Sequence, residues 1–128
     1  GSYIANSIIK LMCKKGTKIN GGRALVLGLT FKENCPDLRN SKVIDIITEL
    51  SDFGLDVEIT DPHASSEEAL REYDVSLAKD IKGKYDVVVG AVAHNEFKNL
   101  SLSNHCHDET VIFDVKGFLD RSLVDKRL

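Results

Sequence analysis

The sequence predicts an α/β fold, a Rossmann-like three-layer sandwich with a mostly parallel sheet of about five strands. Short apolar runs such as 24–28 and 85–91 have the length and composition of strands that are covered on both faces. Between them, residues 43–50 carry apolar side chains at the spacing of one helix face. Because such strands and helices alternate along the chain, we expect βαβ units with right-handed crossovers.

Runs of apolar residues bounded by turn residues predict the strands. The run at 24–28 is apolar throughout, whereas 55–60 alternates apolar and polar residues and ends at Asp61-Pro62. Strands are expected at 24–28, 55–60, 75–77, 85–91 and 110–115.

Periodicity and capping residues predict the helices. Gly54 ends the helix at 41–53, and Ser65 with Glu68 forms a capping box that begins the next helix. Helices are expected at 3–15, 41–53, 65–73, 78–82 and 95–100.

Composition and charge limit the possible functions. With 128 residues, 42% of them hydrophobic and 29% charged, the chain is expected to be a soluble globular protein. The net charge of −3 argues against nucleic acid and anionic membranes as partners. No apolar run approaches the ~20 residues that a membrane span needs. Cys13, Cys35 and Cys106 form neither a disulfide framework nor a CxxC pair, so a reducing, cytoplasmic location is expected.

The expected strand order predicts where a ligand would bind. In open α/β sheets, ligands bind beyond the carboxyl ends of the strands, at the point where the strand order reverses. Here that crevice is expected between the strands 24–28 and 85–91. The loops 30–40 and 92–96 would then line it.

The loop after the first strand differs from a dinucleotide-binding turn. It reads LGLTFKENCPDLRNSK and lacks the GxGxxG pattern. Lys32 and Arg39, followed by a helix N-terminus, could form an anion site. Alternatively, they are solvated side chains that pair with Glu33 and Asp37. The position of the loop in the fold favours the anion site.

Other reactive side chains are interpreted as structural. Asp61 stands where a ribose-binding acid would be, but without the glycines it is interpreted as the turn acid of Asp61-Pro62. Cys35 has no neighbouring His that would activate it as a nucleophile. The side chains of His105-Cys106-His107 cannot all face one ion, so no metal site is predicted. His94 could face the crevice, although a single His is more often a capping or packing residue.

The same motif carries a family resemblance. LGLTFKENCPDLRNSK resembles the start of the C-terminal, UDP-binding domain of the UDP-glucose/GDP-mannose dehydrogenase family. The resemblance covers nearly the whole chain, including the helix at 3–15, Asp61-Pro62, AVAHNEF at 91–97 and FDVKG at 113–117. FKENCPDLRNSK is most similar to the branch that oxidises UDP-N-acetylamino sugars for capsule or O-antigen polysaccharides.

The resemblance implies an oxidoreductase whose other domains precede this chain. Family members oxidise the sugar C6 hydroxyl to a carboxylate with two NAD+ and a cysteine thiohemiacetal. Their NAD-binding domain and catalytic cysteine come before a central helical dimerisation region. We therefore expect residues 1–16 to end that helical region and 17–128 to form a UDP-sugar-binding domain, inactive alone. NAD would be bound mainly by the N-terminal domain, and the full-length enzyme is expected to be a homodimer or larger.

Four residues match positions at which the family binds its ligands. Phe31 and Lys32 match a Phe-Lys pair that contacts the UDP-sugar. Lys116 falls where relatives often have a substrate-contacting arginine, and the change to lysine loses a bidentate fork. Arg39 matches an arginine that reaches NAD in the assembled enzyme. Cys35 does not match the catalytic motif, so no catalytic residue is expected in this chain.

An alternative of a different class is a non-enzymatic, flavodoxin-like or receiver-like signalling or interaction module. Asp61 and Lys116 lie at strand ends, as the phosphorylated acid and the lysine of a receiver would. The acidic pair that would hold Mg2+ after the first strand is missing from the sequence. The identity of the UDP-sugar, UDP binding by the isolated chain and its oligomeric state stay open.

Overall fold

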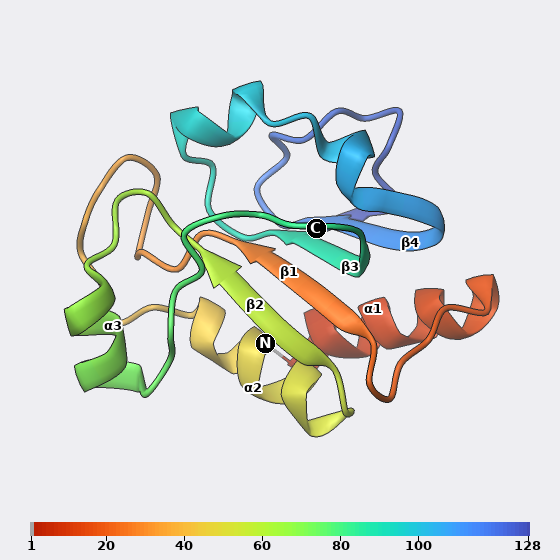
Figure 1. The fold of residues 1–128 in the computed structure, drawn as a ribbon, viewed down its shortest axis with the longest axis horizontal. Helices are drawn as coiled ribbons and strands as arrows, with labels where there is room; N and C mark the ends of the chain where they lie inside the picture. Colours follow the sequence, from red (N-terminus) through yellow and green to blue (C-terminus); the bar gives the residue numbers. More distant parts are fainter. Residues whose placement is uncertain (1) are drawn as a thin grey trace.

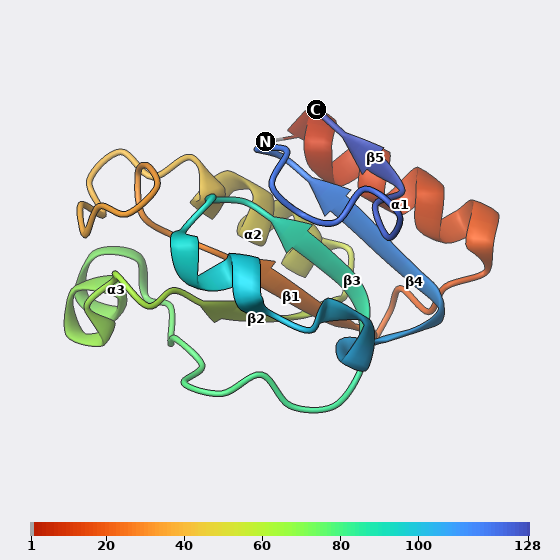
Figure 2. The same ribbon diagram turned by 90° about the horizontal axis from the view of Figure 1, so that it is seen from above.

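The computed structural model describes residues 2–128, and five parallel strands form its sheet (Figures 1 and 2). They are β1 (Arg23–Leu27), β2 (Asp56–Thr60), β3 (Tyr85–Gly90), β4 (Cys106–Asp114) and β5 (Lys126–Arg127). The strand order is β2-β1-β3-β4-β5. The order reverses between β1 and β3, which is the switch point that the sequence predicted.

Three α-helices and two 3-10 helices complete the fold. They are α1 (Ser2–Lys15), α2 (Val43–Asp52), α3 (Ser66–Tyr73), η1 (Asn95–Asn99) and η2 (Leu102–His105). Helices α1 and α2 cover one face of the sheet, while η1, η2 and the segment 115–125 cover the other (Figure 1). The predicted three-layer arrangement is thereby confirmed.

The two cores follow from the alternation of side chains along each strand. Ala24 and Val26 of β1 face the core beneath α1 and α2, whereas Leu25 and Leu27 face the opposite core. All four side chains are buried because the parallel sheet is covered on both faces. The apolar composition of the run at 24–28 is thus explained by burial on both sides.

Two predicted elements are wrong. Residues 75–77 do not form a strand, since only Leu77 pairs with Ile59 in an isolated bridge. Residues 78–82 do not form a helix. Instead, the guanidinium of Arg23 in β1 donates hydrogen bonds to the carbonyl oxygens of Lys82 and Lys84, at 2.9 and 3.0 Å.

The last strands also differ from the prediction. Strand β4 begins at Cys106 rather than near 110, because the pairing with β3 shifts register after Tyr85. The polar residues in this bulge read as a loop in the sequence. The fifth strand is the two-residue β5, which pairs with the end of β4. The helix expected at 95–100 is the 3-10 helix η1.

The ends of the described chain lie close together (Figure 2). The ammonium group of Lys126 donates a hydrogen bond to the Tyr3 hydroxyl at 3.3 Å and lies over its ring. Among residues 2–128, no helix is both long and apolar enough to span a membrane.

Candidate functional site

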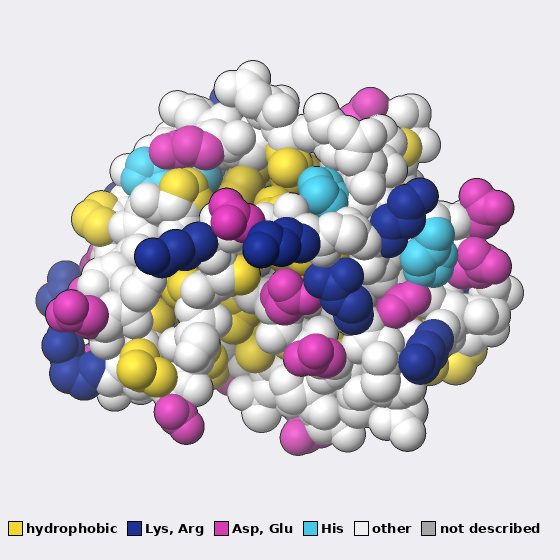
Figure 3. Space-filling view, in the orientation of Figure 1, with side chains coloured by type: hydrophobic (Ala, Val, Ile, Leu, Met, Phe, Trp, Pro, Cys, Tyr) yellow, Lys and Arg dark blue, Asp and Glu magenta, His cyan; other side chains and the backbone are white. Residues whose placement is uncertain are grey.

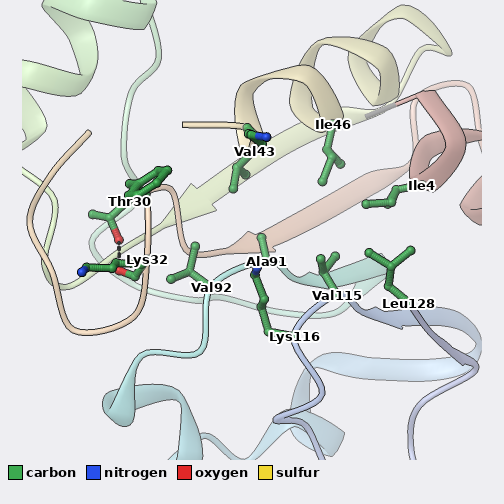
Figure 4. Close-up of a pocket in the computed structure, with 12 residues that line it drawn as sticks. Ile4, Thr30, Lys32, Val43, Ile46, Ala91, Val92, Val115, Lys116 and Leu128 are labelled. Atoms are coloured by element: carbon green, nitrogen blue, oxygen red, sulfur yellow. Dashed lines mark hydrogen bonds between the residues drawn. The ribbon is translucent and has the colours of Figure 1, made fainter. Parts of the chain in front are cut away.

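A cavity of about 490 Å³ opens at the carboxyl ends of β1 and β3 (Figure 4). Residues from six parts of the chain line it: α1, the loop after β1, the start of α2, the segment after β3, the segment after β4 and the residue after β5. They are Ile4, Thr30, Phe31, Lys32, Lys42, Val43, Ile46, Ala91, Val92, Val115, Lys116 and Leu128. Such a volume accommodates a ligand of nucleotide size.

The cavity combines apolar walls with positive charge. Its charged side chains are those of Lys32, Lys42 and Lys116, and no described residue that lines it is acidic. By contrast, Lys and Arg are interspersed with Asp and Glu on the face shown in Figure 3. In a chain with a net charge of −3, this local excess of cations favours an anionic ligand with an apolar or aromatic part.

Asp61, at the end of β2, holds the loop that follows β1. Its Oδ2 accepts hydrogen bonds from the backbone N–H groups of Leu29 and Thr30 at 2.6 and 3.0 Å. Its Oδ1 accepts the N–H of His63 at 2.8 Å, which is the turn role predicted from the sequence. Burial alone would raise the pKa of Asp61. The bonds from Leu29, Thr30, His94 and His63 outweigh burial and lower the pKa below its ordinary value of 3.8.

This arrangement does not fit a dinucleotide bound at the first turn. The N–H groups of Leu29 and Thr30 that could face a pyrophosphate are already donated to Asp61. Gly28 has φ +102, and a Cβ there would lie 2.5 Å from the Cβ of Val92. Protein atoms therefore fill the place that a pyrophosphate would take at this turn, and the cavity lies beside the turn.

A second buried acid holds the loop that carries Lys116. The carboxylate of Asp114, at the end of β4, accepts the N–H groups of Gly117 and Leu119 at 2.9 and 2.8 Å. Arg127 lies 3.3 Å from the same carboxylate and donates to the carbonyl oxygen of Leu119. Asp114 thus fixes the path of the segment that presents Lys116 to the cavity.

The structure brings three of the four predicted ligand residues together. Phe31, Lys32 and Lys116 line the same cavity although more than 80 residues separate the two lysines in the sequence. Arg39 does not line it. Its side chain is 83% exposed and pairs with Asp37 at 3.0 Å. The sequence left open whether Lys32 and Arg39 bind an anion or pair with Glu33 and Asp37. Arg39 pairs with Asp37, whereas Lys32 lines the cavity.

Sequence reasoning did not select Lys42 or the apolar wall. Lys42 precedes the first residue of α2, and its presence in the quoted loop was the available signal. Ile4 and Leu128 had no such signal, because they reach the cavity only through the packing of α1 and β5.

The side chains of the 105–107 segment have separate partners. His105 contacts the Gly83 carbonyl, while His107 contacts Asp86 and Glu109, so their rings have different partners. No group of three metal-ligating side chains that could hold an ion occurs among residues 2–128. Burial raises the pKa of the Cys106 thiol, which keeps it in its less reactive protonated form.

Comparison with known proteins identifies the family. The profile of the UDP-glucose/GDP-mannose dehydrogenase family, UDP binding domain, matches residues 25–121. The chain belongs to this family. The receiver-like alternative is not supported, and the buried Asp61, whose carboxylate is occupied by N–H donors, is a poor phosphate acceptor.

Relatives from two bacteria show the same membership over the whole chain. UDP-N-acetyl-D-glucosamine 6-dehydrogenase of Pseudomonas aeruginosa is 42% identical over 100% of the chain and 31% of its own length. Protein CapL of Staphylococcus aureus is 42% identical over 98% of the chain and 31% of its own length. The family domain described here therefore spans about a third of the relatives it matches.

A solved family structure has the same fold. The UDP-N-acetyl-mannosamine dehydrogenase Cap5O from S. aureus is 26% identical, with a TM-score of 0.71, over 98% of this chain and 29% of its own. An NDP-N-acetyl-D-galactosaminuronic acid dehydrogenase from Methanosarcina mazei has a TM-score of 0.79 at 17% identity, which shows the fold alone.

Proposed function

We propose that this chain is the substrate-binding domain of an NAD-dependent nucleotide-sugar 6-dehydrogenase. The full-length enzyme oxidises the C6 hydroxyl of a UDP-N-acetylhexosamine to a carboxylate for surface polysaccharide synthesis. The observation that carries the proposal is the cavity that Phe31, Lys32 and Lys116 all line. The sugar class is supported by two relatives whose names specify UDP-N-acetylglucosamine and UDP-N-acetylmannosamine as substrates.

The chemistry of the cavity suits a UDP-sugar. A nucleoside diphosphate sugar combines a flat apolar base with a doubly charged diphosphate. The side chains of Lys32, Lys42 and Lys116 offer point charges to the phosphate oxygens. Phe31 is 51% exposed at the cavity and can pack against the ligand without moving out of a core.

NAD is proposed to bind mainly to the N-terminal domain, since the first turn here does not fit a dinucleotide. Arg39 is proposed to reach the cofactor from this chain. Its exposure in the loop between β1 and α2 supports a contact made outside the cavity. Residues 1–16 are proposed to end the central helical dimerisation region while their helix α1 packs against the core of the UDP-sugar-binding domain at 17–128. A homodimeric or larger enzyme and a cytoplasmic location are parts of the same proposal.

The first experiment is a 15N-HSQC titration of the chain with UDP and with UDP-N-acetylglucosamine. Shifts confined to residues 30–42, 91–96 and 115–117 are expected. Resonances that shift with UDP-N-acetylglucosamine but not with UDP would show where the sugar binds. Shifts elsewhere in the molecule, with these three segments silent, would contradict the proposed site.

Separate functions are expected for Arg39 and Lys116. Arg39→Ala should leave the UDP affinity of the chain within about twofold of wild type, because the side chain lies outside the cavity. In the full-length enzyme the same change should raise the KM for NAD. Loss of UDP affinity in Arg39→Ala would place this residue in the substrate site instead.

A further inference from the structure

His94 is a fully buried titratable side chain beside the cavity, and the proposed binding chemistry does not use it. The ring is 0% exposed and follows β3. Its Nε2 lies 2.9 Å from Oδ2 of Asp61 and 3.0 Å from Oγ1 of Thr30. Its Nδ1 lies 2.9 Å from the backbone nitrogen of Asn34. Both ring nitrogens therefore have partners.

These partners determine which nitrogen carries the proton. The backbone N–H of Asn34 can only donate, so Nδ1 of His94 must be unprotonated and accept. The neutral ring then carries its hydrogen on Nε2 and donates it toward Asp61. A protonated ring would present Nδ1–H to the N–H of Asn34 and lose that contact.

Hydrogen bonds to Asp61 and His94 hold the two ends of the segment that carries Phe31 and Lys32. On one side, Asp61 holds the backbone of Thr30 at 3.0 Å. On the other side, His94 holds Asn34, whose side-chain Oδ1 accepts the N–H of Asn95 at 3.0 Å. Phe31 and Lys32 lie between these anchors. Within the bend, the Thr30 hydroxyl also donates to the Lys32 carbonyl at 3.1 Å, and the Phe31 N–H donates to the Asp37 carbonyl at 2.8 Å. His94 is the side chain that links the two anchors to each other.

The ring is suited to positioning rather than to chemistry. It is shielded by neighbouring rings, with centroid distances of 4.5 Å to His63 and 5.6 Å to Phe97. It therefore has no exposed edge with which to reach a substrate. Hydrophobic packing alone would not need a ring with a donor on one side and an acceptor on the other.

We propose that His94, as the Nε2–H tautomer, is a positioning residue for UDP-sugar binding. Its two hydrogen bonds, to Asn34 and to Asp61, connect these residues and thereby hold Phe31 and Lys32 at the cavity. We call this pair of hydrogen bonds the latch. This role rests on the proposed function, but the latch itself is a property of the unliganded chain and can be measured without any ligand.

The first test uses the wild-type chain alone. Long-range 1H–15N spectra should show His94 as the neutral Nε2–H tautomer. A scalar coupling across the hydrogen bond should join the amide nitrogen of Asn34 to Nδ1 of His94. An Nδ1–H tautomer, a mixture of tautomers or the absence of this coupling would overturn the latch.

A matched pair of variants then separates the latch from packing. The side-chain amide of His94→Asn can reach the position of Nδ1, whereas that of His94→Gln reaches the position of Nε2. His94→Asn should keep an acceptor for Asn34, and His94→Gln should lose it. We expect the Asn34 amide to exchange about tenfold faster in His94→Gln than in His94→Asn, as one lost hydrogen bond implies.

UDP affinity should follow the same order. The dissociation constant should rise about tenfold in His94→Gln and change less in His94→Asn. Equal effects of the two variants on the Asn34 amide and on affinity would reduce His94 to a packing residue and overturn the proposal. If the wild-type chain bound no UDP at millimolar concentration, the affinity arm would be measured in the full-length enzyme. The tautomer and the coupling would still decide whether the latch exists.

Discussion

At the scale of single residues, two buried carboxylates shape the cavity without lining it. Asp61 and Asp114 each stand at the end of a strand and accept backbone N–H groups of a loop that carries a cavity residue. For Asp61, these donors lower the pKa and stabilise the charged form. These acids therefore contribute order to the loops as well as stability to the fold.

Asp61 makes stability depend on acid pH. Its pKa is lowered on folding, so its contribution is fully present above the unfolded value near 3.8 and is lost as the pH falls through the folded value. We expect the stability gap between wild type and Asp61→Asn to be about 2 kcal/mol at pH 7 and to shrink from about pH 4 downward. Urea unfolding at steps from pH 7 to pH 2 measures the gap. A gap that stays constant over this range would contradict the assignment.

Lys116 should contribute to phosphate binding. Lys116→Ala is expected to weaken UDP binding about tenfold, since a partly exposed charged hydrogen bond is lost. Uridine, which has no phosphate, should bind wild type and variant alike. Lys14→Ala is the matched control, because Lys14 is exposed in the last turn of α1 and loses the same charge. An equal loss of UDP affinity in the control would indicate a long-range charge effect instead.

At the scale of elements, the end of β1 and the segment after β3 are in close contact. Gly28 places its Cα against Val92, with φ +102 and a Cβ position 2.9 Å from the Val92 nitrogen. The N–H groups of Ala91 and Val92 both donate to the carbonyl of Leu27 at 3.0 Å. This contact joins the end of β1 to the segment after β3, and Val92 of that segment forms part of the cavity wall.

Gly28 should tolerate no side chain. Gly28→Ala is expected to cost about 3 kcal/mol or more, because it adds backbone strain to a collision with Val92. Gly16→Ala provides the control: Gly16 also has a positive φ, +75, but nothing lies within 4 Å of its Cβ position. That variant should lose only about 1 kcal/mol. Denaturant unfolding of both variants measures the difference, and similar losses would show that the contact with Val92 can relax.

At the scale of the whole molecule, α1 belongs to the main core and also reaches the cavity. Ile4, Ile8 and Met12 are buried in the cluster beneath the sheet, and Ile4 also lines the cavity. The helix therefore contributes to the stability of the fold and to the shape of the proposed site.

Deletion of residues 1–16 should prevent cooperative folding of the remainder. Three large side chains at about 1.5–3 kcal/mol each amount to much of the stability of a domain of this size. The deleted chain is expected to give a poorly dispersed 15N-HSQC spectrum. Asn6→Ala, on the exposed side of α1, should leave the spectrum and the stability unchanged. A well-dispersed spectrum of the deleted chain would show that residues 17–128 fold independently.

The local sequence pattern was sufficient to predict those elements whose signal lies within a few residues. The apolar run of β1, the periodicity of α2 and the capping residue Ser65, whose Oγ accepts the N–H of Glu68, each carry their signal within a few residues. The position of the cavity at the ends of β1 and β3 also followed from the sequence, because the βαβ pattern restricts the strand order. Phe31, Lys32 and Lys116 were selected through the family motif.

Tertiary structure decided what depends on partners distant in the sequence. The register shift in β4, the irregular segment 78–82 and the pairing of β5 with β4 arise from contacts with other strands or with Arg23. The same is true of His94, whose sequence context showed no partner but whose ring joins two loops. Sequence periodicity reports on burial within one element. The partner of a buried polar group depends on how distant elements pack, so it becomes visible only in the folded molecule.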